Sequence, residues 1–369
     1  MIIDSVSGEK TSADILIQDG IIKEIGSGLT AEAGTEIVNL EGSYVSDGWV
    51  EAHTHVEWEG GQVGLDPERT YPADGITYVV DAGTDGPLNY EFVHNKLAAL
   101  SIPGKSYLHV ARYGSVRRGK ELLEPELLDK EAFRAAYRDF RDEIIGVKIR
   151  IDPRVNADIV STLRASRELA DELELPLIIH PTQCPESLDL ILSYMGKNDV
   201  YAHTYSGIAP CILDEKGIVR DCVWEARKRG VWFDLSHGSN NFTFEVDAKA
   251  MAQDFVVDTI STDLHSANIL GAVKSMPETM SKMLYLGMSL EIIINKITEQ
   301  TIRMLGLKDK TLGIKVGKKA DLTAFRVESG CFSLIDSVKV SVSIDKRIST
   351  VATIFGDNLY LPRKTVFLK

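Results

Sequence analysis

Two histidines, His53 and His55, close a short apolar run and are separated by one residue. The run, residues 48–55, is rich in residue types that favour extended backbone, so it predicts a β-strand. Because side chains alternate between the two faces of a strand, both imidazoles would point to the same side and can bind one metal ion together. The alternative is that both histidines bond only to carbonyl groups or water near a strand end. Other ligand-type residues must decide between these interpretations.

Further ligand-type side chains fall near the ends of other predicted strands, which cover residues 75–81, 106–111, 144–149, 177–180, 200–203, 231–235 and 259–263. Four stand out: Lys148, His180, His203 and Asp263. Three of these residues also fit a role that does not involve a metal ion. His180 precedes a proline at a strand end, His203 fits a buried and hydrogen-bonded imidazole, and Asp263 can cap the following segment. Their joint placement at strand ends favours one shared metal centre.

Lys148 is the least expected of these residues, because it interrupts Val147 and Ile149 in a strand that should be buried on both faces. A buried ammonium group is costly, and a protonated amine cannot bind a cation. A desolvated amine can instead add carbon dioxide and become a carbamate, whose oxygen atoms can bridge two divalent ions. The alternative is an ion pair with Asp81 or Asp234, which the four imidazoles expected nearby make less favourable.

The order of the predicted elements indicates the architecture. Eight strands alternate with amphipathic helices, such as residues 130–141 and 157–172. This pattern favours an α/β fold with a TIM-like (β/α)₈ barrel over an open doubly wound sheet, and no Gly-x-Gly-x-x-Gly follows a strand. Residues 13–26 predict a hairpin around Asp19–Gly20, and strand patterns return at 320–325, 338–344 and 351–355. We expect a barrel from 48–310 and a small β-sandwich domain from 1–47 and 311–369.

Composition excludes several classes of function. The net charge of -13, with no long basic run, argues against a nucleic-acid partner. No segment has the apolar length needed to cross a bilayer, and the N-terminus has no signal-peptide pattern. The four cysteines lack metal-finger spacing, which favours reduced thiols and a cytoplasmic location.

The whole pattern resembles the amidohydrolase superfamily: His-x-His after strand one, Lys on strand four, His on strands five and six, and Asp on strand eight, in a barrel flanked by a small β-sandwich. Residues 313–322 resemble the return of that family's chain into the sandwich. Within the superfamily, residues 45–50, 146–150, 233–238 and 260–263 resemble a branch of deacetylases often labelled dihydroorotases or adenine deaminases.

The resemblance implies two divalent metal ions. His53, His55 and Asp263 would hold the more buried ion, His180 and His203 the more exposed one, and Lys148, carboxylated by CO₂, would bridge them. Zinc is the expected metal, although manganese, iron or cobalt can substitute. The implied reaction is hydrolysis of the amide or ester bond of a small N-acyl or O-acyl compound, such as an acylated amino or hydroxy acid. A hydroxide shared by the ions would attack, and Asp263 would carry its proton to the leaving group.

Substrate contacts are expected near the ends of strands three, four, seven and eight, from Arg112, Tyr113, Arg150, Asn240 and His265. A guanidinium offers a bidentate fork to a substrate carboxylate, but Arg150 can equally neutralise the surroundings of the carbamate. The positions of His94 and His109 indicate structural roles. His237 fits either a pocket-lining residue or a support for its loop.

Three alternatives remain open on sequence alone. Ring opening of a cyclic amide, as in dihydroorotases and hydantoinases, uses the same metal centre, and the strand-three loop, residues 112–120, is expected to separate it from deacetylation. Deamination of a purine usually requires one metal and no bridging lysine, so Lys148 argues against it. A metal-free scaffold protein would be expected to have lost ligands, whereas all six positions are filled. We also expect a homo-oligomer.

Overall fold

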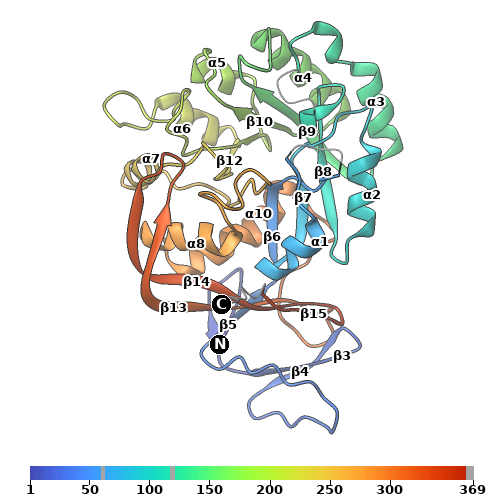
Figure 1. The fold of residues 1–369 in the computed structure, drawn as a ribbon, viewed down its shortest axis with the longest axis vertical. Coiled ribbons are helices and arrows are strands. Elements are labelled where there is room, and N and C mark those ends of the chain that lie inside the picture. Colours follow the sequence, from blue (N-terminus) through green and yellow to red (C-terminus); the bar gives the residue numbers. More distant parts are fainter. Residues whose placement is uncertain (60–62, 117–120, 363–369) are drawn as a thin grey trace, which may run out of the picture.

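The computed structural model describes residues 1–59, 63–116 and 121–362. The end of the strand-three loop, residues 117–120, therefore lies outside the described residues. Within the described chain, a curled parallel sheet is surrounded by helices, and a second sheet lies at one end of the molecule (Figure 1). The chain is thus an α/β protein, consistent with the predicted TIM-like barrel.

Seven strands form the curled sheet, and strands adjacent in space are adjacent in sequence, all parallel. They are β6 (Trp49–Thr54), β7 (Ile76–Asp81), β8 (Gly104–His109), β9 (Ile144–Ile151), β10 (Leu177–Pro181), β11 (Val200–Tyr201) and β12 (Trp232–Phe233). The intervening helices are α1 (Pro67–Thr70), α2 (Glu91–Ala99), α3 (Lys130–Asp139), α4 (Ile159–Leu173), α5 (Leu188–Ser193) and α6 (Asp221–Lys228). Seven of the eight predicted strands are therefore confirmed.

The prediction of an eighth regular strand is wrong. Its segment makes single parallel bridges, from Thr259 to Asp234 beside β12 and from Leu264 to Thr54 at the end of β6. Asp263, the last residue of the predicted strand, has a φ of 49°, which lies in the left-handed region rather than the extended one. The segment nevertheless connects the two edges of the curled sheet.

Four helices follow β12: α7 (Phe244–Met251), α8 (Met276–Tyr285), α9 (Leu290–Ile297) and α10 (Glu299–Leu305). The predicted helices 130–141 and 157–172 correspond to α3 and α4. Both begin at an aspartate that accepts a backbone hydrogen bond: Asp129 from Ala132 N and Asp158 from Ser161 N, each at 2.9 Å. None of the helices in the described part of the chain is long and apolar enough to cross a membrane.

Alternation along the strands separates two apolar clusters. Val79, Leu108, Val147 and Ile179 belong to the large cluster that includes helix residues, whereas Tyr78, Val80, Tyr107 and Ile178 belong to a smaller cluster with Met304 and Leu305 of α10. His180 follows Ile178 by two residues, so it lies on the same face nearer the carboxyl end of the strand. Because apolar side chains fill this face further down, polar groups can gather only at that end.

The second sheet contains strands from both ends of the chain, in the order β15 (Asn358–Tyr360), β14 (Ser341–Phe355), β13 (Asp321–Ile335), β5 (Tyr44–Asp47), β1 (Ile2–Ile3) and β2 (Lys10–Thr11). Only the start of β13 pairs with β5. The rest of β13 and β14 forms a long hairpin that extends past α8 towards α7 (Figure 1). The turn of this hairpin, residues 336–340, is called the hairpin turn below.

The predicted hairpin near the N-terminus is confirmed. β3 (Asp14–Gln18) and β4 (Ile21–Gly26) pair antiparallel as a separate two-stranded sheet. Asp19 and Gly20, with φ of 50° and 68°, form the turn, which requires positive φ at both positions. The division of the chain into a barrel and a β-sandwich domain, at the residue boundaries given above, stays a prediction.

Candidate metal centre

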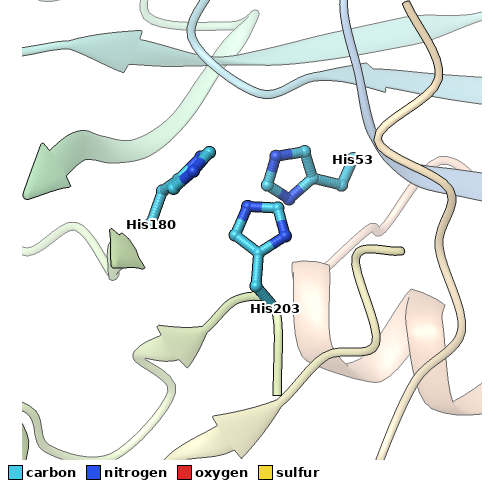
Figure 2. Close-up of side chains that lie close together, drawn as sticks. All are labelled: His53, His180 and His203. Atoms are coloured by element: carbon cyan, nitrogen blue, oxygen red, sulfur yellow. The ribbon is translucent and has the colours of Figure 1, made fainter. Parts of the chain in front are cut away.

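The six predicted ligands converge at the carboxyl end of the curled sheet. Their side chains come from β6, β9 and β10 and from the residues just after β6 and β11, and Asp263 comes from the segment that connects the sheet edges. Potential ligand atoms lie within 4.8 Å of one another in two groups, His53 with His180 and His203, and His53 with His55 and Asp263. Figure 2 shows the three imidazoles of the first group facing one another. Residues far apart in the sequence thus form one cluster.

Lys148 lies within this cluster. Its side chain is buried, and its Nζ is 3.3 Å from Nε2 of His53. The alternative ion pairs find no support, because the described contacts of Asp81 and Asp234 use their carboxylate oxygens for backbone and hydroxyl donors. Burial lowers the pKa of the Lys148 amine to about 8. A neutral amine, the form that can react with CO₂, is therefore accessible near neutral pH.

Asp263 connects the two groups. Its Oδ1 is 3.4 Å from Nε2 of His55 and 3.9 Å from Nε2 of His53, and its Oδ2 is 4.0 Å from Nε2 of His203. Burial by itself raises the pKa of this carboxyl, but the hydrogen bond with His55 and the neighbouring imidazoles outweigh that effect and hold the pKa well below its usual range. Asp263 is therefore an anion at neutral pH, the state required of a metal ligand and of a proton acceptor.

Hydrogen bonds behind the imidazoles fix their tautomers. The Thr84 hydroxyl donates to Asp81 at 2.6 Å, so it must accept from Nδ1 of His55 at 2.7 Å. The Ser236 hydroxyl donates to Asp234 and accepts from Nδ1 of His53 at 3.0 Å. With each proton on Nδ1, the Nε2 lone pairs are left for a metal ion, an arrangement typical of metal-binding histidines.

His203 provides the most direct test of whether a metal fits. Its Nδ1 donates to the Ser236 carbonyl at 2.5 Å, and its buried Nε2 has no hydrogen-bond partner within the described residues. Burial lowers the pKa of His203 to about 4, so the ring is neutral at pH 7. A buried nitrogen lone pair aimed at other ligand atoms is costly unless it binds an ion. The donor set, rich in imidazole with one carboxylate, suits zinc-type metals.

His180 differs from His53 and His55 in the ring nitrogen that is left for a metal ion. Its Nε2 lies 2.8 Å from the Thr182 hydroxyl, which leaves Nδ1 available to an ion. The ring is stacked edgewise on His203 with 4.0 Å between centroids. Burial holds the pKa of His180 well below its ordinary value, so this ring is neutral as well. Each of the four imidazoles therefore has a ring nitrogen that could bind a metal ion in this cluster.

The contact between His55 and Thr84 leads to a testable prediction. Thr84→Val removes the hydroxyl that orients His55 with little change in volume. We expect metal affinity to fall about 10- to 100-fold, the usual effect of losing such an outer hydrogen bond. Chelator competition on purified protein measures the affinity. Thr350→Val is the matched control, because the Thr350 hydroxyl has no hydrogen-bond partner in the described chain. Equal affinities in wild type and Thr84→Val would contradict the role.

The ligand cluster opens into a cleft of about 140 Å³. Of the five predicted substrate contacts, Arg150, Asn240 and His265 line it, whereas Arg112 and Tyr113 are not among its lining residues. Arg112 instead donates to Asp129 at 2.7 Å. Arg150 donates to Glu121 at 2.8 Å and to Asp152 at 3.1 Å, so its guanidinium is already partly paired.

Other residues of the cleft were missed from the sequence: Ser115, Arg154, Thr182, Ser239 and Asn241. Arg154 follows the end of β9 by three residues, a signal that could have identified it. Asn241 gave no comparable signal. Its amide oxygen is buried without a hydrogen-bond partner in the described residues, so it is ready to accept one from a ligand.

The remaining histidines have structural contacts. His94 bonds Glu143 at 2.7 Å, and Nδ1 of buried His109 accepts from Ala111 N at 2.9 Å. His237 is resolved as a support for its loop: it is fully buried, stacks on Phe242, and its Nε2 lies 2.7 Å from the buried Nζ of Lys282.

Comparison with known proteins agrees with this geometry. The family model described as "Amidohydrolase family" matches residues 48–368. A deacetylase from Enterococcus faecalis is 29% identical over 353 residues, which is 94% of this chain and 95% of the relative. A structure described as an adenine deaminase has a TM-score of 0.86 at 28% identity and covers 94% of this chain and 95% of its own. One described as a dihydroorotase has a TM-score of 0.89 at 25% identity and covers 99% and 97%. The chain therefore belongs to the amidohydrolase family of metal-dependent hydrolases.

Proposed function

We propose that the protein hydrolyses the amide or ester bond of a small N-acyl or O-acyl compound at a centre of two divalent metal ions. The observation that carries the proposal is the convergence of four imidazoles, one carboxylate and one buried amine at a single cleft. The similarity of nearly the whole chain to a relative named deacetylase supports acyl compounds as the substrate class.

The proposed ligand assignment follows the two groups of side chains. His53, His55 and Asp263 would hold one ion, His180 and His203 would hold the other, and Lys148, as a carbamate, would supply oxygen ligands to both. Formation of the carbamate joins the amine nitrogen to the carbon of CO₂ and releases one proton. The lowered pKa of Lys148 supports this step, because only the neutral amine reacts. Zinc is the proposed metal on the basis of the imidazole-rich donor set.

The proposed mechanism gives Asp263 the proton transfers. When bound, the metal ions lower the pKa of a water molecule and polarise the acyl carbonyl of the substrate. Asp263, an anion next to three ligand imidazoles, accepts the proton of the attacking water and delivers it to the leaving nitrogen or oxygen. The acyl carbon gains the water oxygen, the C–N or C–O bond breaks, and the leaving group departs protonated.

The position of three predicted substrate contacts in the cleft supports their role in substrate binding. Arg150, Asn240 and His265 line it beside the ligands, and the unpartnered amide oxygen of Asn241 adds a hydrogen-bond acceptor. We propose that the positive charge of Arg150, and of neighbouring Arg154, favours substrates with a carboxylate, as in acylated amino or hydroxy acids. For Arg112 and Tyr113 the cleft gives no such support.

The architectural part of the proposal is a complete (β/α)₈ barrel over residues 48–310, with the segments 1–47 and 311–369 as a small β-sandwich domain. The bridges that connect residues 259–264 to both edges of the curled sheet support the barrel. The pairing of β5 with β1 and β13 supports a domain that combines the two ends of the chain.

A cyclic amidase is the second candidate. The structure described as a dihydroorotase covers 99% of this chain with a TM-score of 0.89, and a dihydroorotase centre would need the same ligands. Purine deamination has weaker support despite the neighbour described as an adenine deaminase, because it usually proceeds with one metal and without a bridging lysine.

A substrate panel tests the proposal. Protein purified without chelator is assayed for metal and then, with Zn²⁺ restored, for hydrolysis of N-acetyl amino acids, O-acetyl hydroxy acids, cyclic ureides and adenine. We expect about two equivalents of metal and turnover of one acyl class. Turnover of only a cyclic ureide would select the second candidate, and release of ammonia from adenine would select a deaminase. Protein without metal or turnover would support a scaffold role.

A further inference from the structure

Residues 236–243, the larger part of the loop between β12 and α7, contact both the proposed ligands and the cleft. This segment is called the cleft loop here. Ser236 bonds two ligand imidazoles, and Ser239, Asn240 and Asn241 line the cleft. Gly238, with φ of 58°, passes so close to Asp263 that an added Cβ would lie 2.7 Å from its Oδ2. The position of this loop therefore determines where a substrate can sit relative to the ligands.

The cleft loop is held by a residue nearly a hundred positions further along the chain. Ser337, in the hairpin turn, accepts a hydrogen bond through Oγ from Phe242 N at 3.2 Å and donates through Oγ to the Gly238 carbonyl at 3.3 Å. Its backbone N donates to the Phe242 carbonyl at 3.0 Å. Ser337 thus bonds to Gly238 and Phe242, which lie on either side of the three cleft-lining residues 239–241.

The hairpin turn is itself well fixed. Buried Asp336 accepts from Val338 N at 3.0 Å and Val340 N at 2.8 Å through Oδ1, and from Phe244 N at 3.2 Å through Oδ2. Further along the hairpin, Ile348 N donates to the Ser281 hydroxyl of α8 at 2.8 Å. The turn therefore offers the cleft loop a stable attachment.

We propose that Ser337 is a positioning residue that keeps the cleft loop in the conformation that binds substrate. The inference rests on the proposed function, since it assigns the loop to substrate binding. Ser337 contacts neither the ligands nor the cleft, so its loss should weaken substrate binding without removing metal. We expect KM to rise about tenfold in Ser337→Ala, with kcat within about twofold, because the hydroxyl makes two hydrogen bonds of ordinary net strength.

The experiment compares wild type, Ser337→Ala, Ser337→Thr and Ser333→Ala, all metal-loaded. Ser333→Ala is the matched control, because its hydroxyl bonds Ser341 on the exposed part of the same hairpin. Steady-state kinetics give KM and kcat, elemental analysis gives metal content, and hydrogen–deuterium exchange reports on the amides of residues 236–244. We expect faster hydrogen–deuterium exchange and higher KM only in Ser337→Ala. Ser337→Thr retains the hydroxyl, so its exchange and KM should match those of the wild type.

Two results would overturn the inference. One is unchanged KM and unchanged exchange in Ser337→Ala; the other is loss of metal together with kcat, which would place the effect at the ligands. If the wild-type protein hydrolyses no acyl compound, the proposed function fails separately. The exchange of residues 236–244, which needs no substrate, then decides whether Ser337 holds the loop.

Discussion

Asp263→Asn is expected to lower kcat by about 10²- to 10⁴-fold while metal remains bound, because the variant loses the proton carrier of the reaction. The amide keeps an oxygen ligand of the same size. Asn also tolerates the left-handed backbone found at this position, with φ of 49°, better than most residues. The substitution therefore changes the chemistry of the side chain with little change to the fold.

Three measurements make this prediction specific. Elemental analysis shows whether the ions stay, kcat is measured on the best substrate of the panel, and thermal unfolding shows whether the variant folds. Asp345→Asn is the control, since this carboxylate is exposed on β14. Full activity in a metal-loaded Asp263→Asn protein would show that Asp263 does not carry the proton.

The second large effect is expected for Lys148→Met. The substitution keeps an unbranched, apolar side chain in a buried position and removes the amine that would carry the carbamate. We expect less than the full two equivalents of metal and a fall in kcat of about 10²- to 10³-fold or more, the cost of losing electrostatic stabilisation at a reacting centre.

A chemical test separates the carbamate from a merely structural lysine. Wild-type apoprotein is reconstituted with Zn²⁺ in buffer with and without bicarbonate, and activity is expected to depend on bicarbonate. Lys296→Met serves as the control, since Lys296 lies on α9 and its Nζ donates to the Val257 carbonyl at 2.6 Å. Normal metal content and activity in Lys148→Met would leave the bridging role without support.

The ligand cluster was predictable from the sequence because apolar runs that contain or end in a ligand-type residue are visible in it. In a parallel barrel the carboxyl ends of all strands lie at the same end of the barrel. A polar residue at the end of each apolar run therefore predicts a shared site. His180 and His203 each follow such a run directly, and Lys148 was recognisable because it interrupts one. Their common position did not require any knowledge of the loops.

The rest depended on contacts that leave no local pattern. Residues 259–263 make a single bridge in place of the strand that their composition favours, and the backbone of Asp263 departs from the extended conformation. Arg112 was expected in the cleft, but its pairing with Asp129 depends on how the chain after β8 folds back. The link between Ser337 and the cleft loop joins residues nearly a hundred positions apart, and serine is too common to indicate such a contact.

The order of strands in the second sheet has a consequence for biosynthesis. β5 pairs with β13, which leaves the ribosome only after every strand of the curled sheet and all six proposed metal ligands have been made. Contacts between distant parts of the chain form late and slowly. A nascent chain that ends before residue 337 would thus contain all six proposed ligands but lack the Ser337 hydrogen bonds that hold the cleft loop. Translation must reach the final hairpin before Ser337 can form its hydrogen bonds to the cleft loop.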